Sequence, residues 1–168
     1  MTPVGPTLTG LSEDDADNAG QSVASIVQGS ISDVDSGAQQ GIAIYFSYSG
    51  TGGTAGHWEY SLDAGSTWVA MGTLSDTASL LLRPEDYVRF VPAGENSASA
   101  SISYRAWDQT TDNAGDLVDT STRGGTSSFS TAVDHAGMLI TAVNDAPVLD
   151  TAASPALLGI NEDLAAPT

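Results

Sequence analysis

The sequence predicts an all-β fold, a sandwich or a barrel of short strands, with little helix. Short patches alternate apolar with polar residues, and clusters of Gly, Asp, Asn and Pro separate these patches. No stretch shows a sustained helical apolar repeat. With 168 residues and 40% hydrophobic content, the chain is long enough for one domain with a sizeable core.

The first half of the chain predicts four strands, which are Gln21–Val27, Gly41–Tyr48, His57–Leu62 and Trp68–Met71. Between the last two, Asp63-Ala64-Gly65 supplies residues that tolerate a positive φ, so a short hairpin loop is expected at Ser61–Ser66. The Gly/Thr-rich stretch Ser49–Gly56 is expected to be a surface loop.

The second half predicts strands at Leu80–Leu82, Tyr87–Pro92, Ala100–Trp107 and Ser128–Val143. The last is expected to break near His135-Ala136-Gly137. Leu74–Leu82 is the best helix candidate and equally fits a turn into a strand. Thr110–Thr126 is a long acidic loop, and loops of that length are usually functional or mobile.

The charge balance excludes several classes of partner. Four Lys+Arg against 21 Asp+Glu give a net charge of −17, so neither nucleic acid nor insertion into a membrane is expected. No apolar run is long enough for a membrane span, and no cysteine is present for a disulfide or thiolate metal site. A cationic partner or bound metal ions fit this balance better.

The carboxylates are clustered, which points to calcium. They group at Glu13–Asp17, at Asp33 with Asp35, around Asp108, and at Asn144-Asp145. Two ionised carboxylates about 4 Å apart repel by about 4 kcal/mol at an effective dielectric of about 20, and four arginines are too few to balance them. Ca²⁺ takes several such oxygens at once, and Asp-x-Asp spacing lets two side chains reach one ion. The alternative is that these acids are solvated or adapt the surface to high salt.

An ordered set of motifs resembles one known group of proteins. Its members are Ile31-Ser32-Asp33-Val34-Asp35-Ser36-Gly37, Trp58-Glu59-Tyr60-Ser61, Val88-Arg89-Phe90-Val91-Pro92, Tyr104-Arg105-Ala106-Trp107-Asp108 and Ala142-Val143-Asn144-Asp145-Ala146-Pro147. In this order they resemble the cadherin-like or Ig-like tandem repeats of large bacterial surface adhesins, including the RTX type, from Glu13 to Asp150.

The resemblance implies an Ig-like or cadherin-like Greek-key β-sandwich of about seven to nine strands, with calcium at the junctions between repeats. Asp33, Asp35 and Asp108 match ligands at the end facing the preceding repeat. Glu13, Asn144 and Asp145 match ligands at the opposite end, with Glu85 or Asp86 as a poor stand-in for a further acidic motif there. The incoming stretch Val4-Gly5-Pro6 lacks the Asn-Asp pair, which puts occupancy of the upper junction in doubt.

The resemblance also orders the chain into parts. Residues 1–12 are expected to be an incoming linker, 13–150 the sandwich, and 151–168 a linker with the start of the next repeat, whose order stays open. The two ends carry a weak internal repeat, in which Glu13 and Glu162 stand 162 − 13 = 149 residues apart.

The function expected from all this is a non-enzymatic, calcium-binding extender or adhesion module of a secreted, extracellular protein. Its partners would be neighbouring repeats of the same polypeptide, with a host or biofilm surface ligand as a further candidate, and the fragment is expected to be a monomer. The alternative is a carbohydrate- or peptide-binding sandwich. A single Asp-box-like motif at Ser61–Trp68 and the two histidines carry too little pattern to predict an enzyme.

Overall fold

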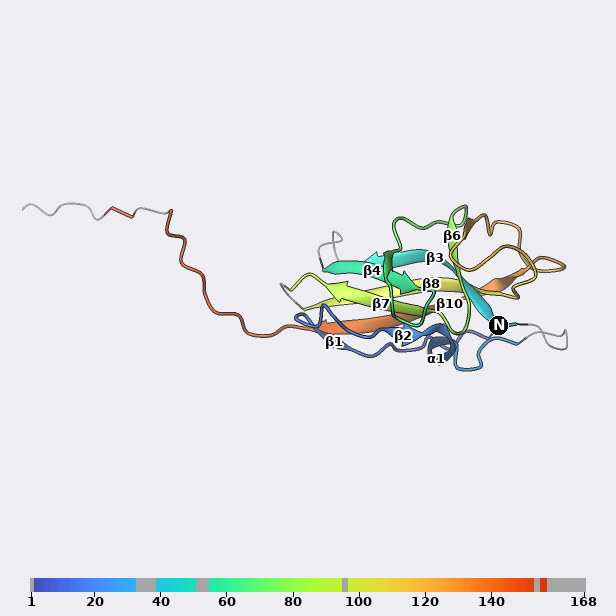
Figure 1. The fold of residues 1–168 in the computed structure, drawn as a ribbon, viewed down its shortest axis with the longest axis horizontal. Helices are drawn as coiled ribbons and strands as arrows, with labels where there is room; N and C mark the ends of the chain where they lie inside the picture. Colours follow the sequence, from blue (N-terminus) through green and yellow to red (C-terminus); the bar gives the residue numbers. More distant parts are fainter. Residues whose placement is uncertain (1, 33–38, 51–54, 95–96, 153–154, 157–168) are drawn as a thin grey trace, which may run out of the picture.

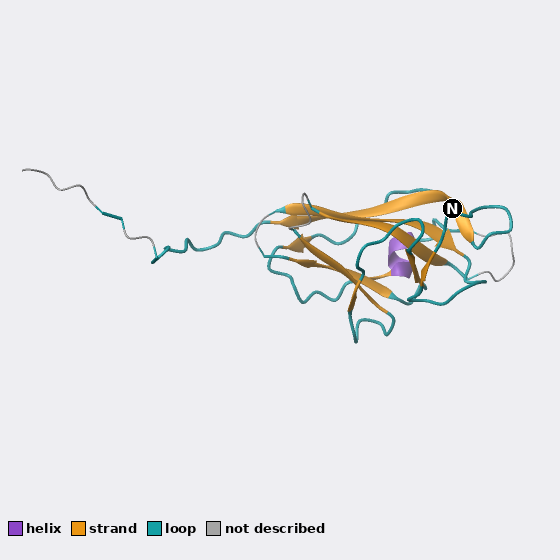
Figure 2. Cartoon of the chain, turned by 90° about the horizontal axis from the view of Figure 1, so that it is seen from above, coloured by secondary structure: helices purple, strands orange, loops and turns teal. Residues whose placement is uncertain are grey.

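The computed structural model describes residues 2–32, 39–50, 55–94, 97–152 and 155–156. It is all-β, as the alternating pattern predicts, and its two packed sheets form a sandwich, as the resemblance implies. Figure 1 shows the sandwich with a C-terminal segment, residues 142–152, that leaves one end of it, and Figure 2 shows the two layers at right angles to that view.

The larger sheet has six strands in the order β1-β10-β8-β3-β6-β9. These are β1 (Leu11–Ser12), β3 (Gly41–Ser49), β6 (Ser79–Leu82), β8 (Ala98–Trp107), β9 (Leu117–Val118) and β10 (Phe129–Thr141). Neighbouring strands are antiparallel except for β1, which runs parallel to β10 with Leu11 opposite Ile140.

The smaller sheet has four strands in the order β2-β7-β4-β5, and all of its pairs are antiparallel. Its members are β2 (Gln21–Ser22), β4 (Gly56–Ser61), β5 (Val69–Ala70) and β7 (Tyr87–Pro92). The described chain therefore has ten strands instead of seven to nine, because four of them are only two residues long.

The main core lies between the sheets and is built by alternation along the strands. In β7 every second residue is buried, and Phe90 meets Trp58 of β4 edge to face with ring centroids 5.3 Å apart. The Trp58 indole N–H donates to the carbonyl of Tyr48 at 3.0 Å. Trp58 is thus a core residue.

A second, smaller core lies on the outer face of the six-stranded sheet. Ala43, Leu81, Trp107 and Phe129 are buried there, with Val118 packed against them. The long acidic loop supplies Val118 and bonds to β6, since the Gly115 N–H donates to the Leu81 carbonyl and the Leu81 N–H to the Asp116 carbonyl. This loop covers the sheet and contains the short strand β9.

The first predicted strand, Gln21–Val27, is wrong beyond Ser22. A one-turn helix, α1 (Val23–Val27), begins there, because the Ser22 hydroxyl accepts the Ser25 N–H at the N-cap. Val23, Ile26 and Val27 are all buried, a spacing that fits one face of a helix.

Of the two alternatives for Leu74–Leu82, the turn into a strand is confirmed, because Ser75 bridges to Ala78 in a turn and Ser79–Leu82 pairs as β6. One further expectation differs from the structure. The last strand is unbroken at residues 135–137 because Ala136 is fully buried and Gly137 pairs on both sides, with Ser101 and with Thr7. Its irregularity lies earlier, between Phe129 and Val133.

The predicted hairpin at Ser61–Ser66 is confirmed and joins β4 to β5. Ala64 and Gly65 both take a positive φ in it, +56° and +88°. The Ser61 hydroxyl accepts the Gly65 N–H at 2.8 Å and donates to Asp63 at 2.7 Å, and Asp63 in turn accepts the Thr67 N–H. The Asp-box-like motif at Ser61–Trp68 therefore stabilises a hairpin turn.

Candidate functional site

The first candidate is the end of the sandwich from which residues 142–152 leave. Glu13 lies there directly after β1, and its N–H donates to the carbonyl of Thr141 at the end of β10 at 3.0 Å. Its carboxylate Oε1 accepts the N–H of Val143 at 2.6 Å. One side chain thus holds the end of β1 against the beginning of residues 142–152, named the exit segment here.

The Glu13 carboxylate is unusual because it is buried and only half satisfied. The residue is 2% exposed, and its Oε2 has no hydrogen-bond partner within the described chain. A buried carboxylate oxygen without a donor is costly unless a positive charge or a hydrogen-bond donor reaches it. Glu13 thus has one carboxylate oxygen, Oε2, that is free to accept a hydrogen bond or bind a cation.

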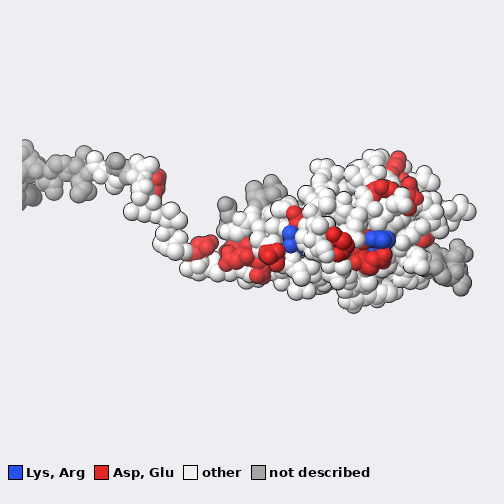
Figure 3. Space-filling view, in the orientation of Figure 1, with Lys and Arg blue, Asp and Glu red and all other residues white. Residues whose placement is uncertain are grey.

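Further acidic and amide oxygens surround this position in the chain. Asn144 and Asp145 directly follow Val143 and are exposed, with the Asn144 amide donating to the Asp145 carbonyl at 3.2 Å. Asp14, Asp15 and Asp17 on the other side of Glu13 are exposed as well. Figure 3 shows acidic side chains gathered at this end, where the exit segment begins.

The remaining predicted ligands do not join this end. Asp108 follows β8 at the opposite end of the six-stranded sheet, and its Oδ1 accepts the N–H and the hydroxyl of Thr110 at 2.9 and 2.7 Å. Asp33 and Asp35 lie outside the described residues. Among the residues that the structure describes, no group of three or more His, Asp or Glu side chains is close enough to hold a metal ion.

The stand-in for a further ligand beside Glu13 is wrong. Asp86 comes before β7 and Gly94 comes after it, and a Cβ at Gly94 would lie 3.9 Å from the Glu13 carbonyl oxygen, so the length of β7 separates Asp86 from Glu13. Asp86 is fully buried and bonded to the Arg83 guanidinium at 2.7 Å, while Glu85 lies 3.4 Å from the same group.

One buried carboxylate was not predicted. Asp134 in β10 is 2% exposed and accepts the N–H groups of Val4 at 2.8 Å, Gly5 at 3.0 Å and His135 at 2.9 Å. Burial by itself would raise the pKa of Asp134. The three N–H donors and the nearby His135 ring outweigh this effect, so the pKa lies below its ordinary value. Counting back by twos from Ile140, Met138 and Ala136 would have placed Asp134 on the inner face.

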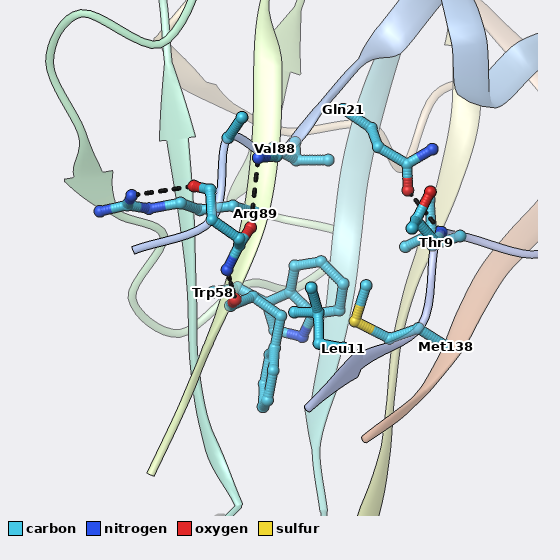
Figure 4. A pocket seen from close by; sticks show the side chains of 12 residues that line it. Thr9, Leu11, Gln21, Trp58, Val88, Arg89 and Met138 are labelled. Carbon is cyan, nitrogen blue, oxygen red and sulfur yellow. Dashed lines mark hydrogen bonds between the residues drawn. The ribbon is translucent and has the colours of Figure 1, made fainter. Parts of the chain in front are cut away.

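The second candidate is a pocket of about 240 Å³ between the sheets, beneath the N-terminal segment. Leu11, Trp58 and Met138 form its apolar lining, and Thr9 and Gln21 lie at one side of it (Figure 4). The Gln21 side chain accepts the Thr9 N–H at 2.7 Å, and the Arg89 guanidinium is bonded to Glu59 at 2.8 Å. The Gln21 and Arg89 side chains are therefore already engaged in bonds, and the pocket offers a ligand mainly apolar surface.

Positive charge is neutralised throughout the described chain. Arg83 pairs with Asp86, Arg89 with Glu59, and both Arg105 and Arg123 with Asp76. In Figure 3 the visible blue atoms accordingly lie beside red ones. Most of the acidic residues that the structure describes thus have no arginine partner.

Comparison with known proteins adds no identification: neither a family model, nor a curated protein, nor a solved structure matches this chain. The one helix described, α1, is far too short to cross a membrane.

Proposed function

We propose that this chain is a calcium-binding extender or adhesion module of a large secreted bacterial surface protein. The observation that carries the proposal is the Glu13 carboxylate, which is buried at the point where the chain leaves the sandwich and keeps one oxygen without a partner. Asn144 and Asp145 are the next residues along the segment that this carboxylate holds.

The donor set at this end is the kind that Ca²⁺ prefers. Calcium binds six to eight oxygens, supplied by carboxylates, amide side chains, backbone carbonyls and water. Glu13 offers a buried carboxylate oxygen, and Asn144 and Asp145 offer exposed ones. The sandwich alone holds too few ligands for a full shell, so the others would come from the neighbouring repeat and from water.

The chain's own residues explain how an ion here would act mechanically. Glu13 already ties the end of β1 to Val143, so any group that binds both Glu13 and Asn144 or Asp145 restricts the exit segment at its first residues. Bound calcium supplies the positive charge that the paired arginines do not. The module would thereby be held in line with the next one, without any enzymatic step.

Calcium titration tests the proposal. After chelation, adding calcium at about ten times its Kd stabilises a protein by roughly 1.4 kcal/mol for each site that only the native state offers. We expect the melting temperature to rise with calcium and much less with magnesium, which demands a smaller octahedral site.

Glu13→Gln should abolish most of this rise while preserving the fold, because the amide oxygen can still accept the Val143 N–H. Glu85→Gln is the matched control, since Glu85 is 64% exposed and lies far from Glu13. An unchanged melt of the parent protein in calcium, or an equal response in both variants, would contradict the proposal.

The alternative is a carbohydrate- or peptide-binding sandwich. A hollow of about 360 Å³ on the outer face of the larger sheet favours it, because Tyr48 and His135 lie beside the small residues Ser99, Ser101 and Gly137. An aromatic ring beside serine hydroxyls suits a sugar ring. Binding on a glycan array that Tyr48→Ala removes, without any calcium effect on the melt, would favour this function over the first.

A further inference from the structure

The pocket between the two sheets, shown in Figure 4, is walled by side chains of the main core. Trp58, Val88 and Phe90 line it from the smaller sheet, and Leu8 and Met138 line it from the N-terminal segment and from β10. Each of these five residues is at most 8% exposed. The pocket is therefore a gap that extends into the core and not a hollow on the surface.

The pocket opens between the N-terminal segment and the loop that precedes β2. Thr9 and Ala19 at this margin are exposed, and Leu11 and Gly20 are partly buried. Residues 6–12, which the sequence predicted to be a linker, thus form one side of the opening. This margin is where a small molecule would reach the gap.

Hydrogen bonds hold the other side of the opening in place. The Asn18 side-chain amide donates to the carbonyls of Asp15 at 2.9 Å and Phe90 at 2.8 Å, and its Oδ1 accepts the Gly20 N–H at 3.1 Å. Gly20 has a φ of +66°, and a Cβ there would lie 2.5 Å from the Val88 carbonyl oxygen, so the turn requires glycine. The pocket is therefore preformed, as sites for small molecules usually are.

The pocket offers no charged partner to a ligand. Its lining contains no Asp or Glu, and its arginine, Arg89, donates to Glu59 at 2.8 Å and to the Asn18 carbonyl at 3.2 Å. The Gln21 side chain accepts the Thr9 N–H. A carboxylate or an ammonium group inside the gap would lose its hydration without gaining a partner. An uncharged ligand is therefore favoured.

The size and the lining of the pocket favour an aromatic ring. An engineered cavity of about 150 Å³, lined by aliphatic and aromatic side chains, is large enough for benzene. This pocket has about 240 Å³. Trp58 and Phe90 already meet edge to face in its wall, and a further ring can extend such a cluster. The thioether of Met138 also makes favourable contacts with aromatic rings.

We propose that this pocket binds a small uncharged aromatic molecule, whose ring is buried beside Trp58, Phe90 and Met138. The binding is driven by the apolar surface that the ring and the pocket wall remove from water. This binding site is additional to the proposed calcium site and does not need the metal. Its experiment is run in chelator, so a failure of the calcium site and a failure of the pocket are separate results.

NMR of the methionine methyl groups tests the inference, because the chain has only three methionines. Met138 lines the pocket, whereas Met71 is buried elsewhere in the main core and does not line it. On titration with toluene, the Met138 methyl resonance should move along a saturable curve, because the ring current of the bound probe acts on it. The Met71 resonance should stay in place. A Met138 resonance that does not move up to the solubility limit of toluene would overturn the proposal.

Benzoate and benzylamine are the matched probes, since each carries the same ring with one charge at neutral pH. At the toluene concentration that gives half of the full Met138 shift, each should produce no more than about a tenth of the toluene effect, because its charge finds no partner in the pocket. An equal shift with either charged probe would contradict the assignment to an uncharged ligand.

Leu11→Phe fills part of the pocket from its margin and should weaken toluene binding by about tenfold or more, since the misfit of one methylene in an apolar pocket already costs about that much. Leu139→Phe is the matched control, because Leu139 lies in β10, is 70% exposed and does not line this pocket. It should leave the Kd unchanged.

A Kd in Leu11→Phe equal to that of the parent would overturn the proposal, as would an equal loss in Leu139→Phe. The Met71 resonance of each free variant reports whether the core has kept its structure. Val88→Ile adds one methylene to the same space and gives the same comparison should Leu11→Phe alter the fold.

Discussion

At the scale of single residues, two carboxylates in this protein stabilise the backbone through hydrogen bonds that the neighbouring sequence does not predict. Asp134 holds the backbone of Val4 and Gly5 to β10 across 130 and 129 residues of chain. Asp63 acts over four residues to shape a hairpin. Both have a pKa below the ordinary value because hydrogen-bond donors favour the ionised form.

Asp134→Asn is expected to lower the free energy of unfolding by about 1–3 kcal/mol, because the amide can accept fewer of the three N–H bonds and loses the charge. The pKa of Asp134 is lower in the folded protein than its unfolded value of 3.8. Its ionisation therefore stabilises the fold fully above that value and progressively less as the pH falls through the folded pKa.

Denaturant unfolding of parent and variant at pH 7 and at steps below pH 4 measures this. The difference between the two proteins should be largest at pH 7 and shrink under acid. A difference that stays constant down to the lowest pH would show that the ionised carboxylate is not what holds the N-terminal segment.

Ser61→Ala is expected to raise the pKa of Asp63 from about 2 toward its ordinary 3.8, because the Ser61 hydroxyl is the largest of the donors that lower it. Carbon-13 NMR titration of the Asp63 carboxyl carbon reads this directly. Ser66→Ala is the control, since Ser66 enters the turn through its backbone N–H. An Asp63 midpoint that does not move in Ser61→Ala would contradict the assignment.

At the scale of elements, the edge strap, which is the N-terminal segment of residues 6–14, pairs with the edge of β10 although little of it is regular strand. Only Leu11 and Ser12 count as a strand, yet Leu8 enters the core and the 240 Å³ pocket lies beneath the segment. The strap also covers the free edge of β10, which would otherwise expose unpaired backbone groups to other chains. Stability of this edge therefore rests on one buried leucine and a few long-range bonds.

Leu8→Ala is expected to destabilise the fold by about 2–5 kcal/mol, the usual cost of removing a buried leucine side chain. Leu139→Ala is the matched control: Leu139 lies in adjacent β10 but is 70% exposed, so its removal should change stability by no more than about 0.5 kcal/mol. Urea unfolding gives both values. Similar losses for the two leucines would mean that the edge strap is not part of the cooperative core.

At the scale of the whole molecule, the dominant feature is unbalanced negative charge. The net charge is −17, and all four arginines are engaged in ion pairs within the fold. The carboxylates left over repel one another, and this self-repulsion acts against the compact state. A divalent cation at the exit end would relieve it locally, whereas simple salt relieves it everywhere.

In chelator, raising sodium chloride from about 0.01 M to about 0.1 M shortens the screening length from about 30 Å to about 10 Å. We expect the melting temperature to rise over this range, because repulsion between exposed carboxylates is screened more than the partly buried arginine pairs. Scanning calorimetry measures it. A melting temperature that falls with salt would mean that attractive pairs outweigh the repulsion.

Period-two patterning and turn chemistry determined much of this protein by themselves. They predicted the all-β class, strand β7 at its observed bounds and the Ser61–Ser66 hairpin. Each of these depends on residues within a few positions of each other. The assignment of Glu13, Asn144 and Asp145 to the end opposite Asp108 came from the family resemblance and not from local pattern.

Tertiary structure alone decided the rest. It turned Val23–Val27 into a helix, since three buried side chains there fit the core only with helical spacing. It made residues 6–12 part of the sandwich, buried Glu13 with one oxygen unpaired, and paired Asp86 with Arg83 away from it. The physical reason is that a carboxylate's partner is chosen by which distant backbone the fold brings within about 3 Å of it, and no local pattern encodes that choice.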